Sequence, residues 1–510
     1  MAKVLLLYSS ANEAIALIEE AVQHTQSPFE SIPFLLKKMD CLMGIGNPAS
    51  AFETGLAAAH LLEPGQVLPK TDAKAETFAD SMVSHVQLNE QEILAVADLP
   101  ALTDETLILL QQVLCKLAIP SYLSRPRHLR AVCFLSFYIT YNNGISPHAA
   151  FPILHIGSVL SAQATTVEEA ARGFAFGRLA IRVVETQAVP PEVACPIYSI
   201  FASHILAWQR PLAETQRYFL ASINKGLETY DITWTSIAVI DRALFSFFAG
   251  ESLDVVQAKL EEATPLLRKG GRGSGHHWLS MPIQMIQRLR DGYKAEEMNS
   301  DSPLDNEGLQ KAQATQSHTY LFATNCYELV VAVFTGNTQA GMNAARACEM
   351  YLPCAVGSYL SAMYMFYSAI LFATNMDLLL PSEVTLLQSK LTMLEFRAKT
   401  CPMTFGHKYI FLKTLMSIGE STNSLETLDA FDEAIYLALE NGFIHDAAFY
   451  AEKTSACLAT SSPKRSAQYL NFARRQYDFW GATAKSIEIT AMLPPSQQLK
   501  GFGNLIIILY

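Results

Sequence analysis

Two helix ends stand out in the C-terminal part of the chain: Ala434-Ile-Tyr-Leu-Ala-Leu-Glu-Asn-Gly-Phe443 and, 39 residues further along, Ala473-Arg-Arg-Gln-Tyr-Asp-Phe-Trp-Gly-Ala482. Both stretches close with a large aromatic residue beside a glycine. Glycine commonly ends helices because it adopts the left-handed backbone conformation at little cost. A pair of helices at this spacing cannot bury its apolar faces alone, so it must stack on neighbouring pairs. These stretches predict an array of helix hairpins.

Small residues repeat the hairpin pattern earlier in the chain. Two sets share one helix face at steps of four and three: Ala51, Gly55 and Ala58, and then Gly341, Ala345 and Cys348. Each set begins five residues after the glycine of a Gly-Asn pair, Gly46-Asn47 or Gly336-Asn337. We therefore expect a helix to end at each of these glycines, and the next helix to pack closely through its small residues.

The glycine turns have a weak periodicity. The candidate turns at Gly46, Gly250, Gly336 and Gly419 are separated by 204, 86 and 83 residues, each close to a multiple of about 41–43 residues, the length of a long helix-hairpin repeat. Nearly every other segment has apolar residues at the helical period. The sequence thus predicts an all-α fold, an α-solenoid of tetratricopeptide-like hairpins, with helix content above about 60% against the roughly one-third of an average domain.

The composition is that of an acidic chain with ample apolar surface to bury. Half of the 510 residues are hydrophobic, and 37 basic against 48 acidic residues give a net charge of −11. A nucleic-acid partner needs clustered Lys and Arg to neutralise phosphates, and the sequence has no such cluster. The nine cysteines contain no Cys-x-x-Cys pair, which favours buried thiols in a reducing compartment. We expect a cytoplasmic protein that binds no nucleic acid.

Two stretches bear on membrane association. The apolar run at the start of the sequence has five residues, fewer than the roughly 7–15 of a secretory signal. Met350–Met376 carries no charge over 27 residues, which exceeds the roughly 20 that span a bilayer. Pro353 breaks this stretch, however, and polar residues interrupt it. We expect a buried helix from Ala355 to Ala373 and no membrane span.

Polar segments interrupt the predicted array at residues 62–74, which contain two prolines and a glycine, and at residues 294–312. The second segment is charged and has little apolar content, which is typical of a linker or loop. We expect it to separate an N-terminal repeat lobe, residues 1–293, from a C-terminal repeat lobe, residues 313–510.

An ordered series of short motifs fills the middle of the chain. It consists of Leu123-Ser-Arg-Pro126, Tyr141-Asn-Asn-Gly-Ile-Ser-Pro-His-Ala-Ala-Phe151, Gly173-Phe-Ala-Phe-Gly-Arg-Leu-Ala-Ile181, Trp208-Gln-Arg-Pro-Leu212, Lys225-Gly-Leu-Glu-Thr229 and Phe247-Phe-Ala-Gly-Glu-Ser-Leu253. In order and spacing the series resembles the tetratricopeptide-like helical region of large hybrid signalling kinases of bacteria and fungi. The resemblance covers roughly residues 35–490.

In that family a protein-kinase-like domain and a predicted ATPase precede the helical region, and a GAF sensor and often a histidine kinase follow it. The resemblance implies a helical superhelix that relays or scaffolds signals, and it transfers no catalytic residue to this chain. This sequence contains none of the family's enzymatic domains.

A search for catalytic motifs finds one partial match. Gly270-Gly-Arg-Gly-Ser-Gly275 fits the first six positions of a P-loop, but His276 stands where the phosphate-binding lysine belongs. We expect a flexible loop between helices and no ATP hydrolysis. A metal site at His276 and His277 would need two further ligands. The sequence also contains no His-Glu-x-x-His, Gly-x-Ser-x-Gly or Asp-Asp motif. We predict no catalytic residue, no cofactor and no metal.

The candidate binding residues are His204, Trp208 and Arg210. The segment Val193–Gln209 carries no charge, and a single helix there would place His204 and Trp208 on one face at i and i+4. Arg210 follows at its end, and indole with guanidinium is a pairing favoured at protein interfaces. The alternative interpretation is a hydrogen-bonded core histidine beside a packed indole.

We predict a scaffold or binding module for a protein or peptide partner in intracellular signalling, with specificity provided by the inner helices of the superhelix. The alternative is a stand-alone helical enzyme that acts on a small molecule in the superhelix cavity. Titratable groups clustered deep in one cavity would favour the enzyme, and a long open groove would favour the scaffold.

Overall fold

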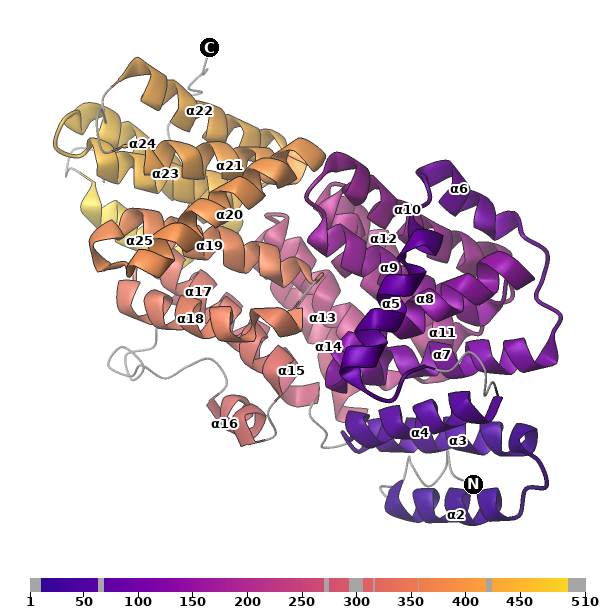
Figure 1. Ribbon diagram of the computed structural model, residues 1–510. Coiled ribbons are helices and arrows are strands. Elements are labelled where there is room, and N and C mark those ends of the chain that lie inside the picture. Colours follow the sequence, from indigo (N-terminus) through magenta and orange to yellow (C-terminus); the bar gives the residue numbers. More distant parts are fainter. Residues whose placement is uncertain are drawn as a thin grey trace. The chain divides into compact units, whose positions relative to one another are not determined.

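The computed structural model describes residues 11–62, 68–269, 275–292, 306–314, 317–355, 357–418 and 424–493. It is 86% helical, and these ranges contain 24 α-helices and no β-strand (Figure 1). The predicted all-α fold is thereby confirmed. The chain divides into two compact units, residues 1–201 and 202–510, and each is described by itself.

The first unit is built from helices that pack on their sequence neighbours, such as α3 on α4, α7 on α8 and α9 on α10. Its helices are α2 (Ala11–Gln23), α3 (Pro28–Gly44), α4 (Pro48–Leu62), α5 (Asp72–Val86), α6 (Glu90–Ala95), η1 (Val96–Asp98), α7 (Glu105–Ser124), α8 (Pro126–Asn143), η2 (Pro147–Ala149), α9 (Ala150–Gln163), α10 (Val167–Thr186) and α11 (Pro191–His204), of which the last ends just inside the second unit. Helix α10 starts with a capping box, in which Thr166 and Glu169 each accept a hydrogen bond from the other's backbone N–H.

The second unit continues the same construction. Its helices are η3 (Leu206–Trp208), η4 (Leu212–Glu214), α12 (Thr215–Thr229), α13 (Ile232–Phe248), α14 (Leu253–Lys269), α15 (Gly275–Asp291), α16 (Asn306–Ala314), α17 (His318–Thr335), α18 (Thr338–Tyr351), η5 (Leu352–Ala355), α19 (Tyr359–Thr374), η6 (Met376–Leu378), α20 (Pro381–Thr400), α21 (Pro402–Met416), α22 (Leu425–Glu440), α23 (Ile444–Leu458), α24 (Pro463–Trp480) and α25 (Thr483–Met492). One continuous hydrophobic core runs through it, from residue 202 to residue 489.

The glycine turns lie where the sequence predicts them. Gly46 and Gly336 follow α3 and α17 with φ angles of +76° and +73°, and Gly442 and Gly481 follow α22 and α24 with +86° and +92°. These left-handed conformations favour glycine because it has no Cβ. Gly250, also a predicted turn, has a φ of +89°, and Gly419 lies outside the described residues.

The small residues on α4 and α18 allow close packing, as the sequence predicts. A Cβ placed on Gly55 would come within 2.6 Å of Leu117 Cδ1 on α7, and one placed on Gly341 would come within 2.9 Å of Leu371 Cδ2 on α19. Neither distance is compatible with a normal van der Waals contact. A larger residue at either position would force these leucine side chains to move.

Distant turns meet inside the second unit. Gly250, between α13 and α14, has a φ of +89°, and a Cβ there would overlap the carbonyl oxygen of Gly442 between α22 and α23. At the end of α24, Trp480 donates a hydrogen bond of 3.0 Å from its indole nitrogen to the carbonyl of Glu251. Helix α25 also packs against α15. The late hairpins therefore close back onto the early ones.

The uncharged stretch Met350–Met376 forms no single long helix. Helix α18 ends at Tyr351, η5 follows, and the buried helix α19 starts at Tyr359 rather than at the predicted Ala355. Among the described residues, α7 is long and apolar enough to cross a membrane, but half of its apolar window is buried inside the protein.

The segment 294–312, predicted as a boundary between lobes, lies within the second unit, whereas the compact units divide after Phe201. Helix α16 occupies its last part and packs on α17, and α15, which precedes the segment, packs on α17 and α25. Residues 293–305 lie outside the described ranges, so the linker role of the segment stays a prediction.

Candidate binding site

The helix that carries His204 is shorter than predicted. Helix α11 ends at His204, because Ile205 leaves the helical conformation with φ −127° and ψ −57°. Trp208 then lies in the short helix η3, so it does not share a helix face with His204. The predicted single helix Val193–Gln209 is therefore wrong beyond residue 204.

Trp208 belongs to the core of the second unit, with 1% of its surface exposed. Its indole N–H donates a 2.9 Å hydrogen bond to the carbonyl of Gly357, and its ring stacks on Phe405 at an interplanar angle of 11°. The guanidinium that contacts the indole belongs to Arg397, 4.3 Å from the ring centroid, and not to Arg210. The geometry is that of a packed indole.

His204 and Arg210 have different surroundings. The Nδ1 atom of His204 lies 2.8 Å from the hydroxyl of Ser203, and burial lowers the pKa of His204 to about 4, so the imidazole is neutral at pH 7. Arg210 is half exposed and pairs with Glu214, four residues further along the chain. The structure does not bring His204, Trp208 and Arg210 together into one surface, and their role in binding stays a prediction.

Charged residues occupy the buried stripe of α20, which the sequence analysis missed. Glu383, Leu387, Lys390, Leu394 and Arg397 follow one another at steps of four and three, and all five are buried. Burial lowers the pKa of Lys390 to about 8 and that of Arg397 to about 10. The sequence does contain a signal. Leu387 and Leu394 mark the face of the helix that should be buried, and charged residues occur at the other positions of that same face.

A second buried charge cluster joins α21 to α23. Lys408 forms an ion pair with Asp446, and both side chains are at most 1% exposed. The imidazoles of His407 and His445 lie 3.8 and 3.5 Å from the Asp446 carboxylate, and the Tyr450 hydroxyl lies 3.0 Å from Nδ1 of His407. Burial raises the pKa of Asp446, but the neighbouring ammonium and imidazoles outweigh this and hold it below its ordinary value. Asp446 is therefore ionised.

The buried charge cluster is surrounded by packed aromatic rings. The ammonium of Lys408 lies 4.6 Å from the centroid of Phe443, and His445 stacks on Trp480 at 5.3 Å. Burial lowers the pKa of His445 to about 4. None of the cluster's side chains lines the cavity described next. Its geometry is that of an ionic contact between two packed helices, which is costly to break on one side only.

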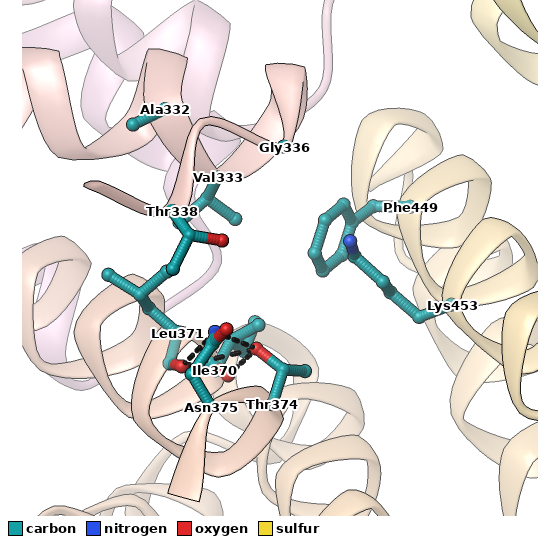
Figure 2. A pocket seen from close by; sticks show the side chains of 10 residues that line it. All are labelled: Ala332, Val333, Gly336, Thr338, Ile370, Leu371, Thr374, Asn375, Phe449 and Lys453. Atoms are coloured by element: carbon teal, nitrogen blue, oxygen red, sulfur yellow. Dashed lines mark hydrogen bonds between the residues drawn. The ribbon is translucent and has the colours of Figure 1, made fainter. Parts of the chain in front are cut away.

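A cavity of about 150 Å³ lies where the α17–α18 turn, the end of α19 and the middle of α23 meet (Figure 2). Its lining residues are Ala332, Val333, Gly336, Thr338, Ile370, Leu371, Thr374, Asn375, Phe449 and Lys453. Figure 2 shows Phe449 and Lys453 facing Val333 and Thr338 across the opening. The cavity is smaller than most ligand sites, and its lining combines apolar side chains with polar ones.

The predicted loop at residues 270–275 lies almost entirely outside the described residues, as do the side chains of His276 and His277. Within the described ranges, no group of three or more His, Cys, Asp or Glu residues is arranged to hold a metal ion.

Comparison with known families gives one match. Residues 345–474 match the family model described as CHK1-like, TPR repeats. The matched segment runs from α18 into α24, and it includes the buried charge cluster and two walls of the cavity, α19 and α23. No curated protein matches the chain. The match supports a tetratricopeptide-like helical region, and such repeats generally mediate protein–protein interactions.

Proposed function

We propose that the chain is a helical scaffold that binds a protein or peptide partner in intracellular signalling, as the helical region of hybrid signalling kinases would. The match of residues 345–474 to tetratricopeptide repeats carries this proposal, because the matched segment folds as successive packed helices. A fold alone implies no chemistry, so the partner must be identified through the binding surface.

The interior of the second unit is a packed core in the part of the chain that the structure describes. Trp208 packs on Phe405, and Phe247 packs on Trp480 with their ring centroids 5.6 Å apart. These side chains fill the space between the packed helices. Partner binding would accordingly use the outer faces and the rims of the hairpins. His204, Trp208 and Arg210 remain the predicted alternative.

The state of the thiols fits a cytoplasmic location, which we include in the proposal. The nine cysteines are present as thiols, and seven of them are buried. Burial raises the pKa of Cys115 and of Cys326 to about 12, which keeps both thiols protonated and unreactive. Free thiols are usual where the compartment is reducing.

Affinity capture of the tagged full-length chain from its source cells, followed by quantitative mass spectrometry, tests the scaffold function. The comparison uses two variants: Gly250→Val, which breaks the contact with Gly442, and Gly406→Ala, where a Cβ would meet nothing closer than 4.0 Å. We expect the native chain and Gly406→Ala to enrich the same proteins, including signalling kinases, and Gly250→Val to lose them.

Two outcomes would contradict the proposal. Enrichment no greater than that of the tag alone would show that the chain is no scaffold. Equal enrichment by Gly250→Val, with its loss of structure verified by circular dichroism, would show that binding does not depend on the folded array. If signalling proteins are absent from a reproducible set of partners, the scaffold stands and its signalling context is wrong.

A further inference from the structure

The cavity of Figure 2 contains two hydrogen-bond donors with no partner among the described residues. The Lys453 ammonium forms no hydrogen bond or ion pair there, and its nearest interaction is with the face of Phe449, 5.2 Å from the ring centroid. The Thr338 hydroxyl on the opposite wall is likewise unbonded in this part of the chain, and Figure 2 shows its oxygen directed into the opening. Both donors therefore face one space.

The other polar groups near the cavity are already used. Asn375 donates to the carbonyl of Leu371 at 2.8 Å, and Thr374 donates to the carbonyl of Ile370 at 2.9 Å. Glu452, the acid next to Lys453 in the sequence, instead pairs with Lys485 at 2.9 Å and accepts a hydrogen bond from Tyr477 at 2.8 Å. The carboxylates of Glu452 and Glu488 attract the Lys453 ammonium at longer range, but among the described residues both pair with Lys485 instead.

Several buried or partly buried lysines of this unit are paired within the described ranges, unlike Lys453. Lys408 pairs with Asp446, Lys259 with Glu251 at 2.6 Å, and Lys390 with Glu349 at 3.7 Å. Lys453 is partly buried, and the partial removal of an ammonium from water costs free energy. The attraction between the ammonium and the face of the Phe449 ring offsets only part of that cost. An anion from outside the chain would complete the site.

The walls define what else the occupant must be. Val333, Ile370, Leu371 and Phe449 are each at most 5% exposed and form the apolar part of the lining. A cavity of about 150 Å³ accepts roughly one benzene-sized group. A group that fits this cavity therefore has about the volume of one side chain, an apolar stem and one negative charge.

We propose that this cavity, the Lys453 pocket, binds an acidic side chain of a protein partner, with the carboxylate between Lys453 and Thr338 and the stem on the apolar wall. This inference rests on the proposed scaffold function and specifies the surface that performs it. A carboxylate accepting from an ammonium makes a charge-assisted hydrogen bond, which is stronger than a neutral one. The partner segment would carry an Asp or Glu next to an apolar residue.

Small probes test the chemistry of the pocket in the full-length chain. Benzoate has the required ring and charge, and benzamide is its neutral counterpart of equal size. We expect benzoate to bind the native chain in ligand-observed NMR, and both benzamide in place of benzoate and the Lys453→Gln substitution to weaken binding by about tenfold or more. Thr338→Val should weaken it less.

The matched control is Lys413→Gln. Lys413 also lies over an aromatic ring, 5.6 Å from the centroid of Tyr409, but it does not line the cavity. Benzoate affinity that is the same in Lys453→Gln and Lys413→Gln would overturn the proposal. Circular dichroism on each variant confirms that the fold is intact.

Selection from a library of random displayed peptides identifies the source of the anion. The native chain and Lys413→Gln should enrich peptides with Asp or Glu at one fixed position beside an apolar residue, and Lys453→Gln should not. Lack of enrichment on the native chain would overturn the proposal, even if benzoate binds, because the site would then take a small acid. Partner capture that is unchanged in Lys453→Gln would leave the scaffold function intact and refute only this pocket.

Discussion

The two compact units bury polar groups in different ways. In the first unit, the Gln111 amide of α7 donates to the carbonyl of Ser136 at 2.8 Å and to the Thr140 hydroxyl at 3.0 Å on α8. In the second unit, the helices α21 and α23 are joined by the ionised pair of Lys408 and Asp446. The neutral network keeps its hydrogen bonds at any pH near neutrality, whereas the ionic pair depends on protonation. The two units should therefore respond differently to mutation and to acid.

The largest effect is expected from breaking the buried ion pair. Lys408→Met leaves the Asp446 carboxylate buried without its counter-ion, and the second unit should lose about 3–5 kcal/mol of stability. All four tryptophans of the chain lie in this unit, namely Trp208, Trp234, Trp278 and Trp480. Urea unfolding followed by tryptophan emission therefore measures the second unit alone.

The control replaces both partners. Lys408→Met combined with Asp446→Leu removes both charges, and most of the lost stability should return because no charge is left buried. A double variant that is less stable than Lys408→Met would show that the pair stabilises the unit beyond satisfying its own charges. A single variant with native stability would show that the two groups are not buried as described.

The next effect concerns pH. The pKa of His445 falls from its ordinary value of 6.5 to about 4 in the folded protein because the ring is buried. Between pH 6.5 and about 4 the unfolded chain binds a proton that the folded chain does not, so stability is lost as the pH falls through this window. The loss should be on the order of 3 kcal/mol for this group.

Urea unfolding by tryptophan emission at pH 7, 5.5 and 4.5 measures this loss, with His445→Phe as the matched variant. Phenylalanine keeps a ring between Trp480 and Phe334 but does not titrate. The slope of stability against pH should become shallower in the variant. An identical slope in both proteins would mean that His445 is not the group that responds.

A smaller effect is expected at the turn that closes the second unit. Gly250→Ala combines a left-handed backbone with an overlap on the Gly442 carbonyl, and it should cost about 2 kcal/mol or more. Gly406→Ala on α21 has room for its methyl group, and it should leave stability unchanged or raise it by up to about 1 kcal/mol. Thermal melting of the two variants side by side checks this pair, and equal melting temperatures would argue against the closure.

The smallest effect is expected at Arg210. The Arg210 side chain is more than half exposed in its ion pair with Glu214. Exposed ion pairs contribute little to the free energy of unfolding. Arg210→Gln should change the stability of the second unit by less than about 0.5 kcal/mol in the same urea experiment. A loss of 2 kcal/mol or more would give Arg210 a structural role that its surroundings do not indicate.

The fold was predictable because local signals determine it. Short stretches of sequence are enough to identify the small-residue stripes on α4 and α18 and the glycine turns at Gly46, Gly336, Gly442 and Gly481. Each signal follows from backbone or packing limits within a few residues, so no knowledge of distant contacts is needed.

The candidate site was harder to predict because it depends on distant contacts. Trp208 lies in an uncharged stretch of sequence just before Arg210. Its contacts in the folded protein are Gly357, Phe405 and Arg397, which lie about 150 to 200 residues further along the chain. The Lys453 pocket likewise combines three hairpins. The periodicity of apolar residues shows which face of a helix is buried, but it does not show which distant helix packs against that face.

Two features of the second unit decide where partners dock: its interior is a packed core, and the proposed docking site is the Lys453 pocket. Affinity capture with two variants, Trp208→Phe and Lys453→Gln, tests these features most directly, since both substitutions preserve much of the side-chain volume. Trp208→Phe should retain the native partners, and Lys453→Gln should lose them while melting at the native temperature. Loss of the partners in folded Trp208→Phe, together with full retention in Lys453→Gln, would contradict the account.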